Sequence, residues 1–262
     1  MPNCLEFRTV QASAFKTLIE TLKELLTDTV IEATPSGLKV IAVDAAHVVL
    51  VHLRLDASRF EYYACARPSL HLAVNMLNLY KLVKTLGNSD TLTVYVDTED
   101  MNHLVVQIDN NEKNTQTVYR LNMLDMDNVS IEVPAEQFDD IIVLNSGDFQ
   151  KLCRDMLHIA DKVEIKVVRG EVTFSCKGDF CTQETTFSSE CLRDTGAEVR
   201  AERQDRIVQG IFPLKYLVIF TRCTNLSDTV ELYFKNSYPL VVRYNVSTLG
   251  EIKLVCAQLV RD

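Results

Sequence analysis

Hydrophobic residues follow two different rhythms along this chain. Over residues 13–26 and 146–160 they recur every three or four positions, which predicts amphipathic helices. Residues 37–44 are typical of a strand, and apolar and polar residues alternate over 49–55, which indicates a second strand on a half-solvated antiparallel sheet. A tight turn bearing His47 separates the two strands. We therefore expect an α+β fold in which helices pack on antiparallel sheets.

The chain repeats itself. The two predicted helices share one spacing of apolar residues, which are Phe15, Leu18, Ile19, Leu22, Leu25 and Leu26 in the first and Phe149, Leu152, Cys153, Met156, Ile159 and Ala160 in the second. Ser13 and Ser146 are predicted to cap these helices. Later, residues 77–96 and 215–234 both predict a helix, a break, Ser-Asp-Thr and an alternating strand. Internal similarity of this kind indicates two copies of one structural unit.

Residues 123–139 have no counterpart in either copy. They contain Pro134, several acidic residues and the apolar pair Ile131 and Val133, and they lack the glycines and serines of a flexible linker. We expect an extended connector on the surface. The predicted organisation is an N-terminal unit over 1–122, a connector over 123–139 and a C-terminal unit over 140–262.

Composition restricts the class of protein. The chain has 262 residues, 47% of them hydrophobic, and a net charge of −9. The eight cysteines form no CxxC pair and have no histidine at zinc-site spacing, so we expect reduced, mostly buried thiols and no metal or cofactor. There is no basic segment followed by a long apolar run at the N-terminus, and no apolar run long enough to span a bilayer. We expect an intracellular protein.

The overall negative charge hides a second pattern. Acidic residues gather between Asp97 and Asp140, whereas each predicted helix has basic residues on one edge. These residues are Lys16, Lys23, Lys81, Lys84, Lys151, Arg154, His158, Lys215 and Arg222. On any one helix they are typical of a solvated face, and Glu20, Glu24 and Asp155 dilute the pattern. Recurrence on four helices favours a surface that attracts a phosphate backbone without reading bases.

Four segments carry a resemblance to a known family. Residues 37–60, 146–165, 215–232 and 238–244 resemble the DNA sliding clamps of the proliferating cell nuclear antigen (PCNA) type, and the resemblance covers essentially the whole chain. It implies that two units joined by a connector form a subunit, and that three subunits close head to tail into a homotrimeric ring with helices lining the hole. The ring would encircle double-stranded DNA, act as a processivity factor for DNA polymerase and dock other replication and repair proteins.

The resemblance also implies partners and a location. An ATP-dependent clamp loader would open the ring, because the chain has no GxxxxGK[ST] phosphate-binding loop of its own. The location would be the nucleus, or a viral replication compartment if the chain is viral. The basic residues named above would face the DNA.

Two further sets of residues follow from the resemblance. A pocket for short hydrophobic-aromatic docking motifs would be lined by Val43, His47, Val48, Leu50, Ile131, Val133, Pro239, Val255 and Ala257. Individually, the apolar members are also consistent with plain core positions, and His47 with a turn residue that satisfies local backbone groups. The contacts between subunits would involve Tyr119, Leu121, Lys151, Asp155 and Phe180, with edge strands at 115–123 and 177–185.

The chain departs from the family pattern at several places. The family's tail of two tyrosines and Leu-Ala-Pro-Lys is here Leu254-Val255-Cys256-Ala257-Gln258-Leu259, without aromatic rings or proline. The lysine that carries ubiquitin in many eukaryotic clamps falls near Arg169. In the 178–183 loop, Phe180, Cys181 and Thr182 replace expected glycines.

Two other hypotheses were weighed. A clamp-like processivity or checkpoint subunit could be monomeric, dimeric or part of a hetero-trimer, with an open DNA-binding face. A nuclease could use the carboxylate pairs Asp139–Asp140 or Glu99–Asp100 to hold a metal. No histidine or third carboxylate converges on either pair by pattern, so we expect that the protein is not an enzyme.

Overall fold

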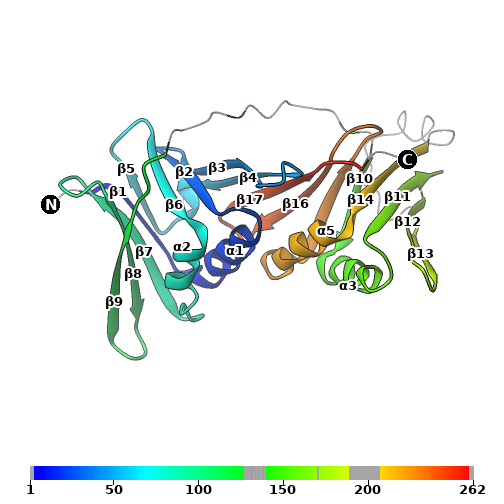
Figure 1. The fold of residues 1–262 in the computed structure, drawn as a ribbon. Helices are drawn as coiled ribbons and strands as arrows, with labels where there is room; N and C mark the ends of the chain where they lie inside the picture. Colours follow the sequence, from blue (N-terminus) through cyan, green and yellow to red (C-terminus); the bar gives the residue numbers. More distant parts are fainter. Residues whose placement is uncertain are drawn as a thin grey trace. The chain divides into compact units, whose positions relative to one another are not determined.

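The computed structural model describes residues 3–126, 131, 138, 140–169, 171–188 and 207–259 (Figure 1). The chain forms two compact units, each of which is described by itself. The first unit comprises residues 1–132 together with 245–252, and the second comprises 133–244 together with 253–262. The boundaries at 1–122, 123–139 and 140–262 stay a prediction.

The first unit packs two helices on antiparallel strands. Its elements in chain order are β1 (Asn3–Thr9), α1 (Ala12–Leu25), β2 (Asp28–Thr34), β3 (Gly37–Val43), β4 (Val49–Asp56), the 3₁₀ turn η1 (Ala57–Arg59), β5 (Tyr62–Cys65), β6 (Leu70–Asn75), α2 (Met76–Val83), β7 (Asp90–Asp97), β8 (His103–Asn110) and β9 (Thr115–Asn122). One sheet has the order β5-β1-β7-β8-β9, and further strands follow the order β4-β3-β2-β6.

The second unit repeats this plan. Its elements are β10 (Asp140–Asn145), α3 (Ser146–Leu157), β11 (Lys162–Val168), β12 (Glu171–Lys177), β13 (Thr182–Phe187), β14 (Ile207–Pro213), α5 (Leu214–Phe220), the 3₁₀ helix η3 (Thr221–Leu226), β15 (Thr229–Phe234), β16 (Leu240–Val246) and β17 (Gly250–Cys256). The last two residues of β16 and the first three of β17 are counted with the first unit. One sheet has the order β13-β12-β11-β14, and further strands follow the order β10-β15-β16-β17. The predicted α+β fold of two repeated units is confirmed.

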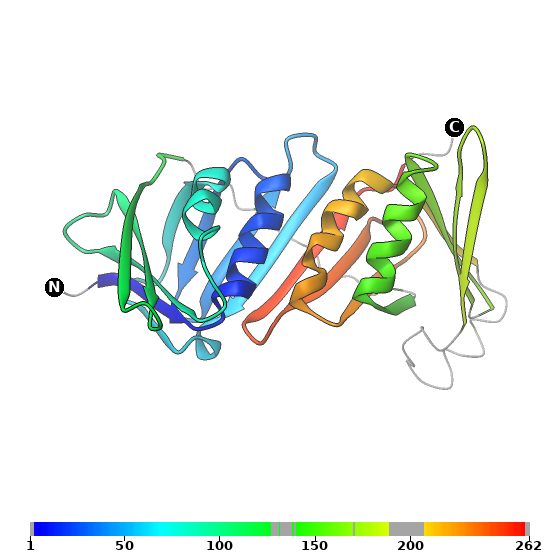
Figure 2. The same cartoon turned by 90° about the horizontal axis from the view of Figure 1, so that it is seen from below.

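The helices bury the apolar stripes that the sequence predicted. In α1 the side chains of Phe15, Leu18 and Leu22 are buried, and in α3 those of Phe149, Leu152 and Met156. Figure 2 shows the helices of each unit lying on one side of its strands, α1 with α2 and α3 with α5. The opposite helix faces are left exposed, which positions their charged residues at the surface.

The helix caps differ from the prediction. Gln11 precedes α1 without a side-chain cap bond, and Ser13 lies inside the helix. Asn145 caps α3, because its Oδ1 accepts the N–H groups of Gly147 and Asp148 at 2.9 and 3.2 Å. Ser146 is buried in the first turn. The predicted Ser13 and Ser146 caps are therefore wrong: the capping position is taken by Gln11, two residues before Ser13, and by Asn145, one residue before Ser146.

The β2–β3 turn requires a glycine. Gly37 has a φ of 139°, and a Cβ atom there would lie 2.0 Å from the carbonyl oxygen of Leu55. The Tyr63 hydroxyl donates to the carbonyls of Thr34 and Gly37 at 2.7 and 3.0 Å, which ties this turn to β5. The close approach of backbone to backbone explains why no larger residue fits.

Candidate DNA-binding surface, docking turn and subunit edges

The predicted basic residues of the first unit lie on its two helices but differ in exposure. Lys81 on α2 and Lys84 at its C-terminal cap are exposed. Lys16 and Lys23 on α1 are partly buried. Lys16 Nζ donates to the carbonyl of Leu86 at 3.1 Å. Among the described residues, Lys81 Nζ donates only to Asn78 Oδ1 of its own helix, at 3.4 Å. The first unit thus has two kinds of lysine, exposed on α2 and partly buried on α1.

The predicted basic residues of the second unit are all exposed. Lys151 and Arg154 lie on α3, His158 caps its C-terminus, Lys215 lies on α5 and Arg222 lies in η3. Nearby acids offset part of this charge on α3, whereas residues 214–226 contain neither Asp nor Glu. Exposed cations on helix faces can exchange solvent and counterions for phosphate oxygens, so both units offer a surface suited to a nucleic-acid backbone.

The turn between β3 and β4 presents the first-unit members of the predicted docking pocket. Val43, Val48 and Leu50 are partly exposed, and His47 is exposed with a φ of 56°. The buried carboxylate of Asp44 holds this turn, because its Oδ1 accepts the N–H groups of Val48 and Val49 at 2.8 and 2.7 Å. The sequence analysis did not single out Asp44. An Asp at the start of a tight turn is the available signal, since its side chain commonly accepts N–H groups a few residues on.

The remaining predicted pocket residues are only partly described. Ile131 is half-buried, and Val133 lies outside the described residues. In the second unit Pro239, Val255 and Ala257 are half-buried.

A cluster of aromatic rings that the sequence analysis missed lies next to Pro239. The ring of Phe138 meets those of Tyr233 and Tyr238 edge-on, with centroids 5.4 and 5.6 Å apart. Lys235 Nζ lies 5.7 Å from the Tyr238 ring centroid. Phe138 and Tyr238 lie outside the helices and strands, so periodicity does not reveal the cluster.

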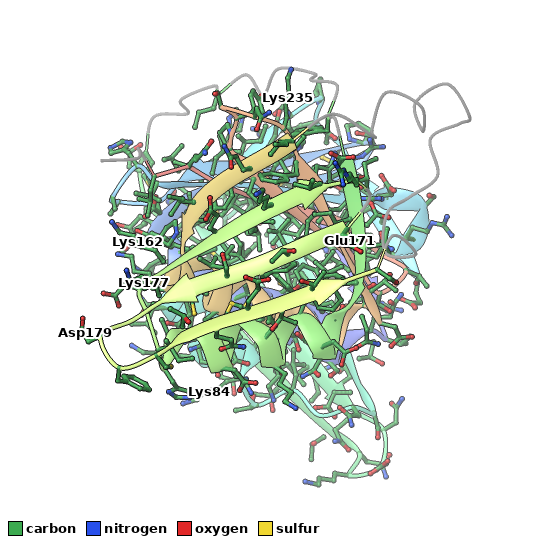
Figure 3. The ribbon with its side chains drawn as sticks, turned by 90° about the vertical axis from the view of Figure 1, so that its right-hand side faces the viewer. Lys84, Lys162, Glu171, Lys177, Asp179 and Lys235 are labelled. Atoms are coloured by element: carbon green, nitrogen blue, oxygen red, sulfur yellow. The ribbon has the colours of Figure 1, made fainter. Side chains whose placement is uncertain are left out.

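The predicted subunit contacts lie at two sheet edges. β9 ends the five-stranded order of the first unit, with Tyr119 and Leu121 half-buried and Val118 exposed. β13 ends the four-stranded order of the second unit, and Figure 3 shows it beside β12, with Lys177 at the end of β12 and Asp179 in the turn that joins the two strands. Phe180, in the turn before β13, is 76% exposed.

Lys151 and Asp155, the other predicted members, are exposed on α3. An exposed strand edge beside an exposed aromatic ring is suited to pairing with another strand.

The carboxylate pairs that a nuclease could use do not belong to a metal-binding cluster in the described part of the chain. Among these residues no group of three or more His, Cys, Asp or Glu side chains could hold a metal ion. Asp100 lies 2.7 Å from Nδ1 of His103, and the hydrogen bond with His103 holds the pKa of Asp100 below its ordinary value. Asp139 lies outside the described residues, and Asp140 is buried.

Cys153 is a buried thiol on the apolar side of α3. Burial raises the pKa of the Cys153 thiol, so this group is not a reactive thiolate. The helices that the structure describes include none with the length and hydropathy of a membrane span.

Comparison with known proteins agrees with this geometry. The model of the N-terminal domain of proliferating cell nuclear antigen matches residues 4–130, and that of its C-terminal domain matches residues 132–259. The chain is also similar to the probable DNA polymerase sliding clamp 1 of Paramecium bursaria Chlorella virus 1, with 36% identity over 96% of this chain and 95% of that protein. Two family domains in tandem account for nearly the whole sequence and for the repeat seen in the fold. The chain therefore belongs to the proliferating cell nuclear antigen family of DNA sliding clamps.

Proposed function

We propose that this protein is a processivity factor that holds DNA polymerase on double-stranded DNA as a homotrimeric ring. The observation that carries the proposal is the exposed basic surface of both units in a chain of net charge −9. Exposed cations recur on equivalent helices of both units although the chain as a whole is acidic, which supports affinity for a phosphate backbone. Sequence-independent phosphate contacts would suit a ring that slides, because each contact exchanges readily with water and ions.

The residues proposed to face the DNA are the seven exposed ones, namely Lys81, Lys84, Lys151, Arg154, His158, Lys215 and Arg222. These seven residues form neither a stack of aromatic rings that could hold unpaired bases nor a recognition helix that could enter the major groove. This supports binding of duplex DNA without sequence preference.

Ring closure is proposed to pair β9 of one subunit with β13 of the next. Each strand ends a sheet order within its own unit, and each has exposed apolar residues in it or beside it, Val118 and Phe180. A head-to-tail contact between two different edges generates a closed ring when the rotation per subunit divides the circle. The trimer follows the family and is the expected closure.

Partner docking is proposed at the Asp44–Val49 turn of the first unit and at Pro239, Val255 and Ala257 of the second. The occupants would be DNA polymerase and other replication and repair proteins, through short segments with hydrophobic and aromatic residues. Loading would depend on an ATP-driven loader. The proposed location is the nucleus or a viral replication compartment, since the relative named above is viral, and no catalytic activity is proposed.

The direct test is charge reversal on the proposed DNA face. Lys81→Glu, Lys84→Glu and Arg154→Glu together should reduce stimulation of a cognate polymerase on primed templates at least tenfold, with little loss of folding, because these side chains are exposed. The matched control reverses three exposed lysines on strands, Lys39, Lys162 and Lys166, and should stimulate as the wild type does. Full stimulation by the helix variant would refute the assigned DNA face.

A further inference from the structure

The two helices of the first unit differ in charge as well as exposure. The polar face of α1 contains Lys16 and Lys23 together with Glu20 and Glu24, so its lysines are balanced by acids. Residues 76–87, which contain α2 and the turn after it, include Lys81 and Lys84 but neither Asp nor Glu. A phosphate backbone is attracted by net positive charge, so α2 offers it more than α1 does.

Lys23 is engaged within its own unit. Its side chain is only 15% exposed, and its Nζ lies 4.7 Å from the centroid of the Tyr80 ring on α2 and contacts Glu24. An ammonium over the face of an aromatic ring is attracted by the ring's negative quadrupole. The long apolar stem of Lys23 thus joins α1 to α2, and reaching a phosphate would require giving up this contact.

Lys16 is engaged just beyond the C-terminus of α2, where its Nζ donates to the Leu86 carbonyl. The repeat supplies an internal comparison, because the equivalent position of α3, one residue after Phe149, is Gln150. Gln150 Nε2 donates to the carbonyl of Thr221 at 2.8 Å, where the second helix of its unit ends. There a neutral side chain donates to a backbone carbonyl near the C-terminus of the second helix, although Thr221 is not the counterpart of Leu86 in the repeat. A bond of this kind does not need a positive charge at position 16.

We propose that Lys16 and Lys23 are positioning residues that fasten α1 to α2, and that the phosphate contacts of the first unit come from Lys81 and Lys84. This inference rests on the proposed DNA-binding function. The four predicted basic residues of the first unit then have two roles: Lys16 and Lys23 position the helices, and Lys81 and Lys84 contact phosphates. The fastening holds α2, and hence its two exposed lysines, in one orientation toward the DNA.

The first experiment measures how DNA affinity depends on salt. The full-length protein is titrated with a fluorescein-labelled duplex of random sequence over a range of NaCl concentrations, and log Kobs is plotted against log salt concentration. Each phosphate contact contributes about 0.9 to the magnitude of the slope. Because a homotrimer holds three copies of each lysine, Lys81→Gln and Lys84→Gln should each reduce it by about 0.9 for every subunit whose lysine contacts a phosphate, up to about 2.7. Lys16→Gln and Lys23→Gln should leave it unchanged.

The second experiment measures the midpoint of thermal unfolding. Lys23→Met removes the charge over Tyr80, and Lys16→Met removes the donor to Leu86, so each should lower the midpoint by about 2–4 °C. Lys16→Gln should stay within a degree or so of the wild type, because Gln can donate as Gln150 does. Lys81→Met is the matched exposed control and should also leave the midpoint unchanged.

The outcomes separate the inference from the proposed function. A slope reduced by about one contact in Lys16→Gln or Lys23→Gln would overturn the inference while supporting DNA binding. Unchanged unfolding midpoints in both methionine variants would overturn it as well. Failure of the wild type to bind duplex at low salt would overturn the proposed function. In that case the midpoints of thermal unfolding would still show whether Lys16 and Lys23 fasten α1 to α2.

Discussion

Asp44 and Val49 close the β3–β4 turn with a reciprocal pair of hydrogen bonds. The Asp44 carboxylate accepts the Val49 N–H at 2.7 Å, and the Asp44 N–H donates to the Val49 carbonyl at 2.9 Å. The same carboxylate accepts the N–H of Val48. The side chain that shapes the proposed docking turn is therefore buried beneath it and does not itself have to touch a partner.

Removing this carboxylate should loosen the turn. Asp44→Ala leaves the N–H groups of Val48 and Val49 without their acceptor, which should cost about 2 kcal/mol of unfolding free energy measured in urea. Binding of a docking peptide with aromatic residues should weaken at least tenfold. Asp44→Asn keeps an acceptor oxygen and should recover much of both losses. Equal peptide affinity in Asp44→Ala and the wild type would show that the turn is not part of the docking site.

A charge at the apolar surface of the turn should block docking without disturbing the fold. Val48 is partly exposed, so Val48→Asp places a carboxylate where a hydrophobic side chain of the partner would pack. Peptide binding followed by calorimetry should disappear, while the mass measured by light scattering stays that of the wild type. The control is Val10→Asp, a similar change at a 54% exposed valine on the segment between β1 and α1. Retained peptide affinity in Val48→Asp would place the pocket elsewhere.

Truncating the exposed aromatic ring before β13 should weaken assembly. Phe180 is 76% exposed in the single chain, so Phe180→Ala should not lower the stability of a monomer. In a ring this residue would be buried, and its loss should shift light-scattering mass from trimer toward monomer at low micromolar concentration. Tyr62→Ala, at a 47% exposed aromatic residue on β5, is the control and should remain trimeric. A wild type that stays monomeric at every concentration would instead favour the open, clamp-like alternative.

Alkaline pH should weaken the tie between β5 and the β2–β3 turn. Burial, followed by the nearby Cys65, raises the pKa of Tyr63 well above its ordinary value, so its hydroxyl stays neutral and donates to Thr34 and Gly37. In the unfolded chain the hydroxyl of Tyr63 ionises at about pH 10. The contribution of Tyr63 is therefore complete below that pH and declines as pH rises through the higher folded-state pKa.

The test compares unfolding free energies of the wild type and Tyr63→Phe. At neutral pH the variant should be less stable by about 1–2 kcal/mol, because two carbonyls lose their donor. Above about pH 10 the difference should narrow, since only the wild type has this hydroxyl to ionise. A difference that stays constant across that range would contradict the role assigned to Tyr63.

The spacing of apolar residues predicted the helices, the strands around His47 and the repeat, because an element that buries one face needs apolar residues at regular intervals. Periodicity did not predict which of two neighbouring residues caps a helix, or which side chains of different elements contact each other. Asn145 displaced Ser146 as a helix cap because β10 runs directly into α3. The spacing of residues placed Lys23 on the polar face of α1. It could not show that the ammonium group of Lys23 would lie over the ring of Tyr80 on α2. The Phe138–Tyr233 contact likewise depends on three-dimensional neighbours that no local pattern records.

The central claim is that the protein holds DNA by encircling it. Purified protein is allowed to thread onto linear duplex, both DNA ends are then blocked with bound streptavidin, and the complex is washed in salt high enough to screen phosphate contacts. A protein that encircles DNA should stay on end-blocked DNA and leave as soon as a restriction enzyme cuts the duplex. Loss of the protein in the salt wash despite blocked ends, or retention after the cut, would contradict it.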